Sequence, residues 1–249
     1  MNKRRALAIT VATPAFLLAY HAVPAMASTA EPSCHGAKAT MVVSAHSKHV
    51  VRGTSHRDVI VIQNPGHVIL ARAGNDIICG STGRDVIAGG AGKDRVFAGA
   101  GADTVSGGPG DDSVSGGTGN DTISGDAGDD TISGDAGSDT ISGDAGSDTI
   151  DGGDGADHLN GGDGNDVENG GAGSDTIDGG DGNDVENGDA GSDTINGGDG
   201  ADHLNGGDGN DVENGGAGDD TIDGGDGNDV EVGSDGTDQV IDDPADQGV

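Results

Sequence analysis

Along most of the chain, one aliphatic residue stands between two polar residues, and a glycine-rich stretch separates each such triplet from the next. The pattern has a period of nine and runs from residue 71 to residue 241 as nineteen units, without insertion or deletion. A representative unit, Gly116 to Ser124, reads GGTGNDTIS. Position four is Gly and position six is Asp in every unit, while position eight is Ile, Val or Leu in fifteen. So strict a period predicts a stacked coil and not a globular core.

Each unit predicts one turn and one very short strand. Positions one to six carry two or three Gly, which lose much conformational entropy on ordering and supply no side chain, so they predict a turn. Positions seven to nine, such as Thr122-Ile123-Ser124, alternate polar, apolar and polar, which predicts a strand with one inward side chain. Two units then close a flat coil of eighteen residues. Successive coils would stack through a parallel sheet on either side.

Apolar contacts alone are too weak to hold such a coil. Burying one Ile or Val contributes roughly 1.5 to 3 kcal/mol, whereas ordering nine backbone residues costs roughly 9 to 18 kcal/mol. Stacking brings Asp121 near Asp139, and these like charges repel unless a cation lies between them. Carboxylates beside glycine carbonyls form an all-oxygen ligand set, which suits a hard cation and Ca²⁺ above all.

Units such as Gly152 to Asn160, GGDGADHLN, resemble the GGxGxDxUx nonapeptide of the RTX, or haemolysin-type, calcium-binding proteins. The resemblance covers 171 of the 249 residues. It implies an all-β fold, a parallel β-roll resembling a right-handed β-helix, with two nonapeptides per turn. It also implies multiple Ca²⁺ ions, held between stacked turns by backbone carbonyls and the Asp at position six. Without calcium we expect the tract to be disordered.

By position, the resemblance assigns the calcium-ligating role to these carboxylates: Asp76, Asp85, Asp94, Asp103, Asp112, Asp121, Asp130, Asp139, Asp148, Asp157, Asp166, Asp175, Asp184, Asp193, Asp202, Asp211, Asp220, Asp229 and Asp238. Alternating between two sides, these nineteen aspartates form seventeen same-side neighbouring pairs, and hence up to about seventeen sites between turns.

The charge of the chain agrees with a cationic partner. The formal net charge is −34, and residues 96 to 249 carry 40 acidic residues and no Lys or Arg, because Arg95 is the last basic residue. Nucleic acid and anionic membrane surfaces are therefore poor partners. Calcium ions are the partners that this composition favours.

Residues 1–27 predict a secretory signal peptide. They begin with Lys3, Arg4 and Arg5, continue with an apolar stretch and end with the small-residue pattern Ala25-Met26-Ala27. The Arg pair leaves the general secretory and twin-arginine routes both open. No other apolar run approaches the roughly 20 residues of a membrane span. We therefore expect an extracellular protein, secreted or associated with the cell wall.

Residues 28–70 predict a lead-in and a cap. The nine-residue phase persists through residues 44–70, where Asp58 stands at position six but His49 and His67 take that place in their units. Because imidazole is a poor calcium ligand, we expect degenerate turns that close the sheet without an ion. The repeats would then span residues 71–241, followed by an acidic tail at 242–249.

Cys34 and Cys79 are the two cysteines of the chain. In an exported protein a disulfide is the default, and it would stabilise by about 4 kcal/mol in the chain-entropy model. A metal pair or a reactive thiol remains the alternative. A zinc cluster at His35, His46 and His49 is a weak alternative, because no further ligand at suitable spacing completes it.

Residues 143–187 and 188–232 are nearly identical 45-residue blocks, and five units per block place the second block on the opposite side of the coil. Four position-eight residues within them are glutamates: Glu168, Glu186, Glu213 and Glu231. Their orientation stays open, because the strand could shift so that the preceding Val faces inward. A glycosidase-like carboxylate pair is the catalytic alternative, but a core two strands wide offers no cleft.

Three functions follow from these patterns. The first is a secreted calcium-binding β-roll that serves as a structural or surface module and is not an enzyme, since the roughly 16 residues between residue 27 and the first phased unit and the eight residues 242–249 are too few for a catalytic domain. The second is an adhesin-like or envelope-associated interaction protein with a cell-wall or surface partner. The third is a polysaccharide-active β-helix enzyme, which lacks aromatic platforms because Phe97 is the one aromatic residue after residue 27.

Overall fold

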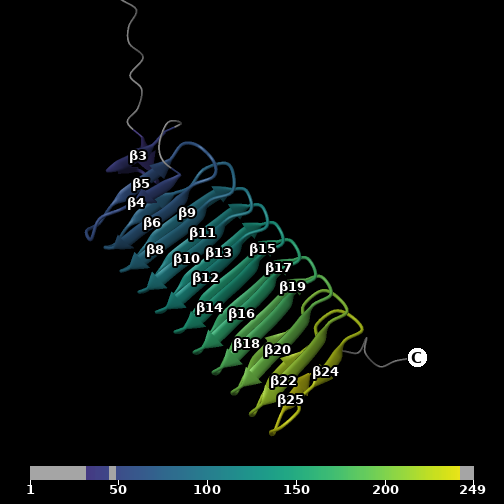
Figure 1. The fold of residues 1–249 in the computed structure, drawn as a ribbon. Coiled ribbons are helices and arrows are strands. Elements are labelled where there is room, and N and C mark those ends of the chain that lie inside the picture. The colour runs from purple at the N-terminus through teal and green to yellow at the C-terminus, as the bar shows by residue number, and fades with distance from the viewer. Residues whose placement is uncertain (1–31, 45–48, 242–249) are drawn as a thin grey trace, which may run out of the picture. The chain divides into compact units, whose positions relative to one another are not determined.

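The computed structural model describes residues 32–44 and 49–241. The expected signal peptide, His46 and the acidic tail lie outside these residues. Within the described ranges the chain forms strands and turns, and no helix there is long and apolar enough to cross a membrane. The strands from β3 to β25 follow one another along a single stack (Figure 1).

Two parallel sheets make up this solenoid, one of twelve odd-numbered strands and one of eleven even-numbered strands in the described part of the chain. The odd sheet contains β3 (Met41–Val43), β5 (Val59–Ile62), β7 (Ile77–Cys79), β9 (Arg95–Ala100), β11 (Ser113–Thr118), β13 (Thr131–Ala136), β15 (Thr149–Asp154), β17 (Val167–Ala172), β19 (Val185–Ala190), β21 (His203–Asn205), β23 (Thr221–Asp223) and β25 (Gln239–Ile241). The even sheet contains β4 (Val50–Arg52), β6 (Val68–Ala73), β8 (Val86–Ala91), β10 (Thr104–Pro109), β12 (Thr122–Ala127), β14 (Thr140–Ala145), β16 (His158–Asp163), β18 (Thr176–Asp181), β20 (Thr194–Asp199), β22 (Val212–Ala217) and β24 (Val230–Val232).

The register of the sheets confirms the predicted coil. Each strand of the repeats pairs in parallel with the strand two further along, so Ile123 of β12 lies beside Ile141 of β14, eighteen residues away. The sheet begins earlier than the phase at residue 44 indicates, because β3 pairs with β5 and places Met41 opposite Ile60. The fold is therefore an all-β parallel roll with two nonapeptides per turn.

The strands are longer than predicted. β12 covers positions seven to nine of one unit and continues through Gly125, Asp126 and Ala127, the first three positions of the next. The prediction that positions one to six are all turn is thus wrong for positions one to three. Local glycine propensity disfavours a strand there, but stacking pairs Asp126 with Asp144 and Ala127 with Ala145 along the sheet.

Inward residues alternate along these strands. In β12, Ile123 and Gly125 face the interior, and equivalent aliphatic residues from Val43 to Ile222 form one continuous core cluster. Position one has no room for a larger side chain: a Cβ added to Gly116 would lie 2.6 Å from Asp121 Oδ2 and 2.9 Å from Gly134 O. Each ordinary unit therefore contributes a single aliphatic side chain to the core.

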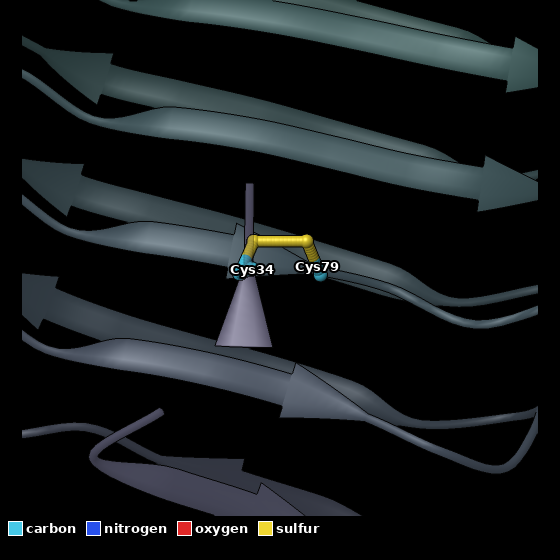
Figure 2. The surroundings of a disulfide bond; sticks show 2 residues. All are labelled: Cys34 and Cys79. Atoms are coloured by element: carbon cyan, nitrogen blue, oxygen red, sulfur yellow. A yellow bond between two sulfur atoms is a disulfide. The ribbon is translucent and has the colours of Figure 1, made fainter. Parts of the chain in front are cut away.

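An antiparallel hairpin covers the first coils. It pairs β1 (Ser33–Cys34) with β2 (Ala37–Lys38), and a disulfide joins Cys34 of β1 to Cys79 of β7 (Figure 2). Cys34 packs with Val59 and Ile77 in a second apolar cluster, where residues of β5 and β7 contact the hairpin. The predicted disulfide is confirmed, and it fastens the lead-in to the first repeat.

Candidate metal centre

Two ladders of buried carboxylates follow the edges of the solenoid, at the point where each turn meets the next strand. The Oδ1 atom of each Asp accepts a hydrogen bond from the backbone N–H of the residue eighteen positions earlier, which is His67 for Asp85 and an Asp for the others; Asp103 N to Asp121 Oδ1, for example, is 2.7 Å. All seventeen same-side pairs predicted from the sequence are joined in this way, from Asp76–Asp94 and Asp85–Asp103 to Asp211–Asp229 and Asp220–Asp238, at 2.6 to 3.2 Å.

The second carboxylate oxygen, Oδ2, is buried in these ladders and accepts no hydrogen bond. The aspartates with this orphaned oxygen are Asp76, Asp94, Asp103, Asp112, Asp121, Asp130, Asp139, Asp148, Asp157, Asp166, Asp175, Asp184, Asp193, Asp202, Asp211 and Asp220. Burying a polar group without a partner costs about 1 to 3 kcal/mol and more for a charged group. A cation bound by these oxygens would offset this cost at every turn.

Backbone oxygens complete the donor set. Asp121 Oδ2 and the carbonyl oxygen of Gly134 in the next coil both face the α-carbon of Gly116, where only the absence of a side chain leaves room for them. Carboxylate and carbonyl oxygens without nitrogen or sulfur are the ligands of Ca²⁺. The residues present therefore fit the hard cation predicted from the sequence.

Burial raises the pKa of these carboxylates. The pKa of Asp112 and of Asp130 rises to about 7, chiefly because burial disfavours the charged form, while the N–H bond to each from the preceding coil lowers it. The same cause raises the pKa to about 6 at Asp76, Asp103, Asp139, Asp166, Asp193 and Asp202. A bound divalent cation would favour the ionised form and reverse this shift.

Asp85 differs from the other predicted ligands. Its Oδ2 accepts hydrogen bonds from the backbone N–H and the hydroxyl of Ser81, at 2.9 and 2.7 Å. Asp58, one and a half coils earlier on the other ladder, is held in the same way by Thr54, at 2.7 and 3.0 Å. In both units the hydroxyl residue stands at position two, four residues before the Asp.

The last two predicted ligands lie toward the C-terminal end. Asp229 and Asp238 are each half-buried, and each Oδ1 still accepts the N–H of the preceding coil, at 2.9 and 3.2 Å. The ladder therefore continues to Asp238, although its end is more open to solvent.

The glutamates at position eight point into the core. Glu168 and Glu186 are 0% and 1% exposed, while the preceding Val167 and Val185 are 45% and 43% exposed. The alternative in which Val turns inward is therefore wrong. Burial raises the pKa of both glutamates to about 9, and that of Glu213 to about 8. Because Glu168 and Glu186 are closed off from solvent, this carboxylate pair offers no surface that a sugar could contact.

The other candidate metal ligands are the histidines of the zinc hypothesis and one group of three carboxylates. His35 of the weak zinc hypothesis stacks on Phe97 with ring centroids 3.6 Å apart, and His46 lies outside the described residues. Within residues 32–44 and 49–241, one group of three His, Cys, Asp or Glu side chains has its ligand atoms close enough to hold an ion, and it consists of Asp184, Glu186 and Asp202.

A parallel solenoid with ladders of buried, unpartnered carboxylates facing glycine carbonyls defines a calcium-binding structural protein. The model of the RTX calcium-binding nonapeptide repeat family (four copies) matches residues 70–105, 106–141, 133–168, 169–186, 187–213 and 214–240. The chain belongs to this family. No curated protein matches the chain.

Proposed function

We propose that this protein is a secreted calcium-binding β-roll that acts as a structural or surface module. We further propose that it stays unfolded inside the cell, where calcium is scarce, and folds outside the cell, where calcium is abundant. The observation that carries this proposal is the column of buried Oδ2 atoms that accept no hydrogen bond. Ordering the glycine-rich coil around them is costly, and a cation that binds only the folded coil stabilises it by mass action.

The charge balance supports many ions. Seventeen neighbouring Asp pairs, each with one Ca²⁺, would bring about thirty-four positive charges to residues 28–249, whose 8 Lys and Arg against 45 Asp and Glu give a formal net charge of −37. The ligands that we propose are the aspartates of the two ladders from Asp76 to Asp238. Asp85 would bind more weakly than its neighbours, because Ser81 already holds its Oδ2.

The proposed location outside the cell rests on two features. Residues 1–27 have the pattern of a signal peptide, and the disulfide between Cys34 and Cys79 is typical of an oxidising compartment. Extracellular calcium modules bind with dissociation constants of about 10⁻⁴ to 10⁻³ M. A roll with such affinity would stay unfolded in a low-calcium cytoplasm and fold after export.

A calcium titration of the purified protein, followed by circular dichroism, tests the proposal. At pH 8 we expect a disordered spectrum in chelator that changes to a strand spectrum near millimolar Ca²⁺, while Mg²⁺ at the same concentration has little effect. A compact sheet that persists in excess chelator, or a random chain that remains in millimolar calcium, would overturn the coupling of folding to calcium.

Two neighbouring aspartates provide a matched pair of variants. Asp130→Asn removes one oxygen ligand but keeps the Oδ1 atom that accepts the Asp112 N–H, whereas Asp129→Asn makes the same charge change at an exposed position. We expect the calcium midpoint to rise several-fold for Asp130→Asn and to stay within error for Asp129→Asn. Equal shifts in the two variants would mean that only net charge matters.

A further inference from the structure

Glu186 is a buried side chain with no role in the ladders described so far. It is 1% exposed, and neither of its carboxylate oxygens has a hydrogen-bond partner. Its place in β19 is a core position, since Leu204 occupies the paired position of β21 and is fully buried. An aliphatic residue there would avoid the cost of desolvating a carboxylate.

The Glu186 carboxylate is aimed at the inner face of a ladder site. A Cβ added to Gly179 would lie 2.5 Å from Glu186 Oε1, 2.7 Å from Gly197 O and 2.9 Å from Asp184 Oδ2. Three oxygens of different origin thus converge on one small space beside the glycine. In an ordinary unit the corresponding third atom is a methyl group, since Ile123 Cδ1 lies 3.2 Å from the equivalent point at Gly116.

A third carboxylate stands close to this space. One ligand oxygen from each of Asp184, Glu186 and Asp202 lies within 4.8 Å of the other two. Oxygens bound to one Ca²⁺ at about 2.3 to 2.6 Å can be up to about 5 Å apart, so the three fit around a single ion. Asp184 and Asp202 each have a buried Oδ2 atom that accepts no hydrogen bond, and all three side chains are buried.

The neighbouring coil adds a second reason for a cation at this place. Glu168 pairs directly with Glu186 across β17 and β19, and both side chains point into the core. Two ionised carboxylates on adjacent strands inside a solenoid repel unless a cation or a proton neutralises them. No Lys or Arg follows Arg95 in the sequence, and His158 and His203 are exposed, so no basic side chain of that region lies in the core beside them.

We propose that Glu186 is an interior calcium ligand, which together with Asp184, Asp202 and the carbonyl of Gly197 forms a three-carboxylate site with higher affinity than the two-aspartate sites of ordinary turns. This inference rests on the proposed function, because Asp184 and Asp202 are also ladder ligands. Glu168 and Glu213 also place an Oε1 atom beside a ladder Oδ2, that of Asp166 at Gly161 and that of Asp211 at Gly206. Among the described residues, the group of three carboxylates is found at Glu186.

Competition between the purified full-length protein and a chromophoric calcium chelator tests this site. Glu186→Gln keeps the shape of the side chain without its charge, and Glu186→Ile recreates the ordinary unit. Asp181→Asn is the control, since it removes one acid from an exposed position of β18. We expect both Glu186 variants to lose one ion from the tightest class or to bind it at least tenfold more weakly, with the control unchanged.

A second readout locates the ion directly. In a calcium-loaded crystal, an anomalous-scattering peak should lie at about 2.3 to 2.6 Å from a Glu186 carboxylate oxygen. Unchanged isotherms in both variants, or a peak beyond reach of Glu186, would overturn the inference while leaving calcium-dependent folding intact. If the wild-type protein itself bound no calcium, the proposed function would fail as well, and circular dichroism of the same samples distinguishes the two results.

Discussion

The two ends of this solenoid are stabilised by different forces. β5, β6 and β7 each bury at least two apolar residues, such as Ile60 and Ile62 in β5 or Ile69 and Ala71 in β6. From β12 to β22 each strand buries one large residue and a position-one glycine, and in β17, β19 and β22 the large residue is a glutamate. The first region resembles an ordinary β-helix core, whereas the second has half as much apolar material per strand.

The carboxylates of the two regions also differ, in whether the protein itself supplies hydrogen bonds to their Oδ2 atoms. At the N-terminal end, Thr54 and Ser81 satisfy Asp58 and Asp85, and a disulfide fastens the hairpin to β7. Along the repeats the corresponding Oδ2 atoms have no protein partner. The comparison teaches that one backbone geometry can be held by side-chain contacts at one end and by ions along the rest, so the preformed end can serve as a template for the remainder.

Chelation should separate the two regions most strongly. With calcium removed, we expect amide protection in β12 to β20 to fall by at least about a hundredfold, since their buried carboxylates lose their counter-ions. Amides of β5 and β6 should lose less, because apolar burial and the disulfide do not depend on calcium. Hydrogen exchange with mass spectrometry measures both in one sample. Uniform loss of protection along the chain would show that the N-terminal end has no independent stability.

Changes of pH should act in opposite directions with and without calcium. In the ion-free roll, the pKa values of about 7 for Asp112 and Asp130 exceed the unfolded value near 4. The folded state then binds more protons between these limits, so ion-free stability is present at low pH and is lost as the pH rises through about 7. With calcium present, protons compete for the ligands, and the roll should weaken as the pH falls.

Circular dichroism from pH 5 to pH 8, in chelator and in excess calcium, checks these signs. The range stays above the sequence isoelectric point of about 4.1, where the protein would carry no net charge and tend to precipitate. Strand content that is equally low at pH 5 and pH 8 in chelator would contradict the burial argument for Asp112 and Asp130.

Ser81→Gly should make the coil that contains Asp85 resemble the coils of the later repeats. It removes the hydroxyl that holds Asp85 Oδ2 and introduces the glycine common at position two of the later units. We expect the Asp85 site to bind calcium more tightly in the variant and, without calcium, the coil to lose about 1 kcal/mol of local stability. The calcium affinity from calorimetry is the measurement, with Ser81→Thr as the control that keeps the hydroxyl. An isotherm of Ser81→Gly identical to that of the unmodified protein would mean that the hydroxyl does not weaken calcium binding at Asp85.

Periodicity predicted much of the fold. The constant spacing of Asp at position six and of Ile, Val or Leu at position eight places Asp121 beside Asp139 and Ile123 beside Ile141, and both neighbours are found. Local propensity did worse, since it predicts a turn at Gly125 to Ala127, where β12 continues. The extra strand residues come from pairing with the next coil, which a single unit read in isolation cannot reveal.

The site was predictable in outline but not in its exceptions. The aspartate ladder follows from spacing alone, whereas the satisfaction of Asp85 by Ser81 requires side-chain geometry within one turn. The direction of Glu168 and Glu186 was also beyond the sequence, because Val and Glu can each face inward if the strand shifts by one residue. Register with Ile150 on one side and Leu204 on the other fixes both glutamates toward the core.

The tandem blocks have one further consequence. Because a block holds five units, Glu168 and Glu186 belong to the odd sheet, but their copies Glu213 and Glu231 belong to the even sheet. Each duplication thus adds two and a half coils, or about 12 Å at a strand spacing of about 4.8 Å, and exchanges the two faces. Because one nine-residue unit is half a coil, recombination between units can lengthen the rod in steps of half a coil. The length of the rod can therefore change while its surface keeps the same repeating residues.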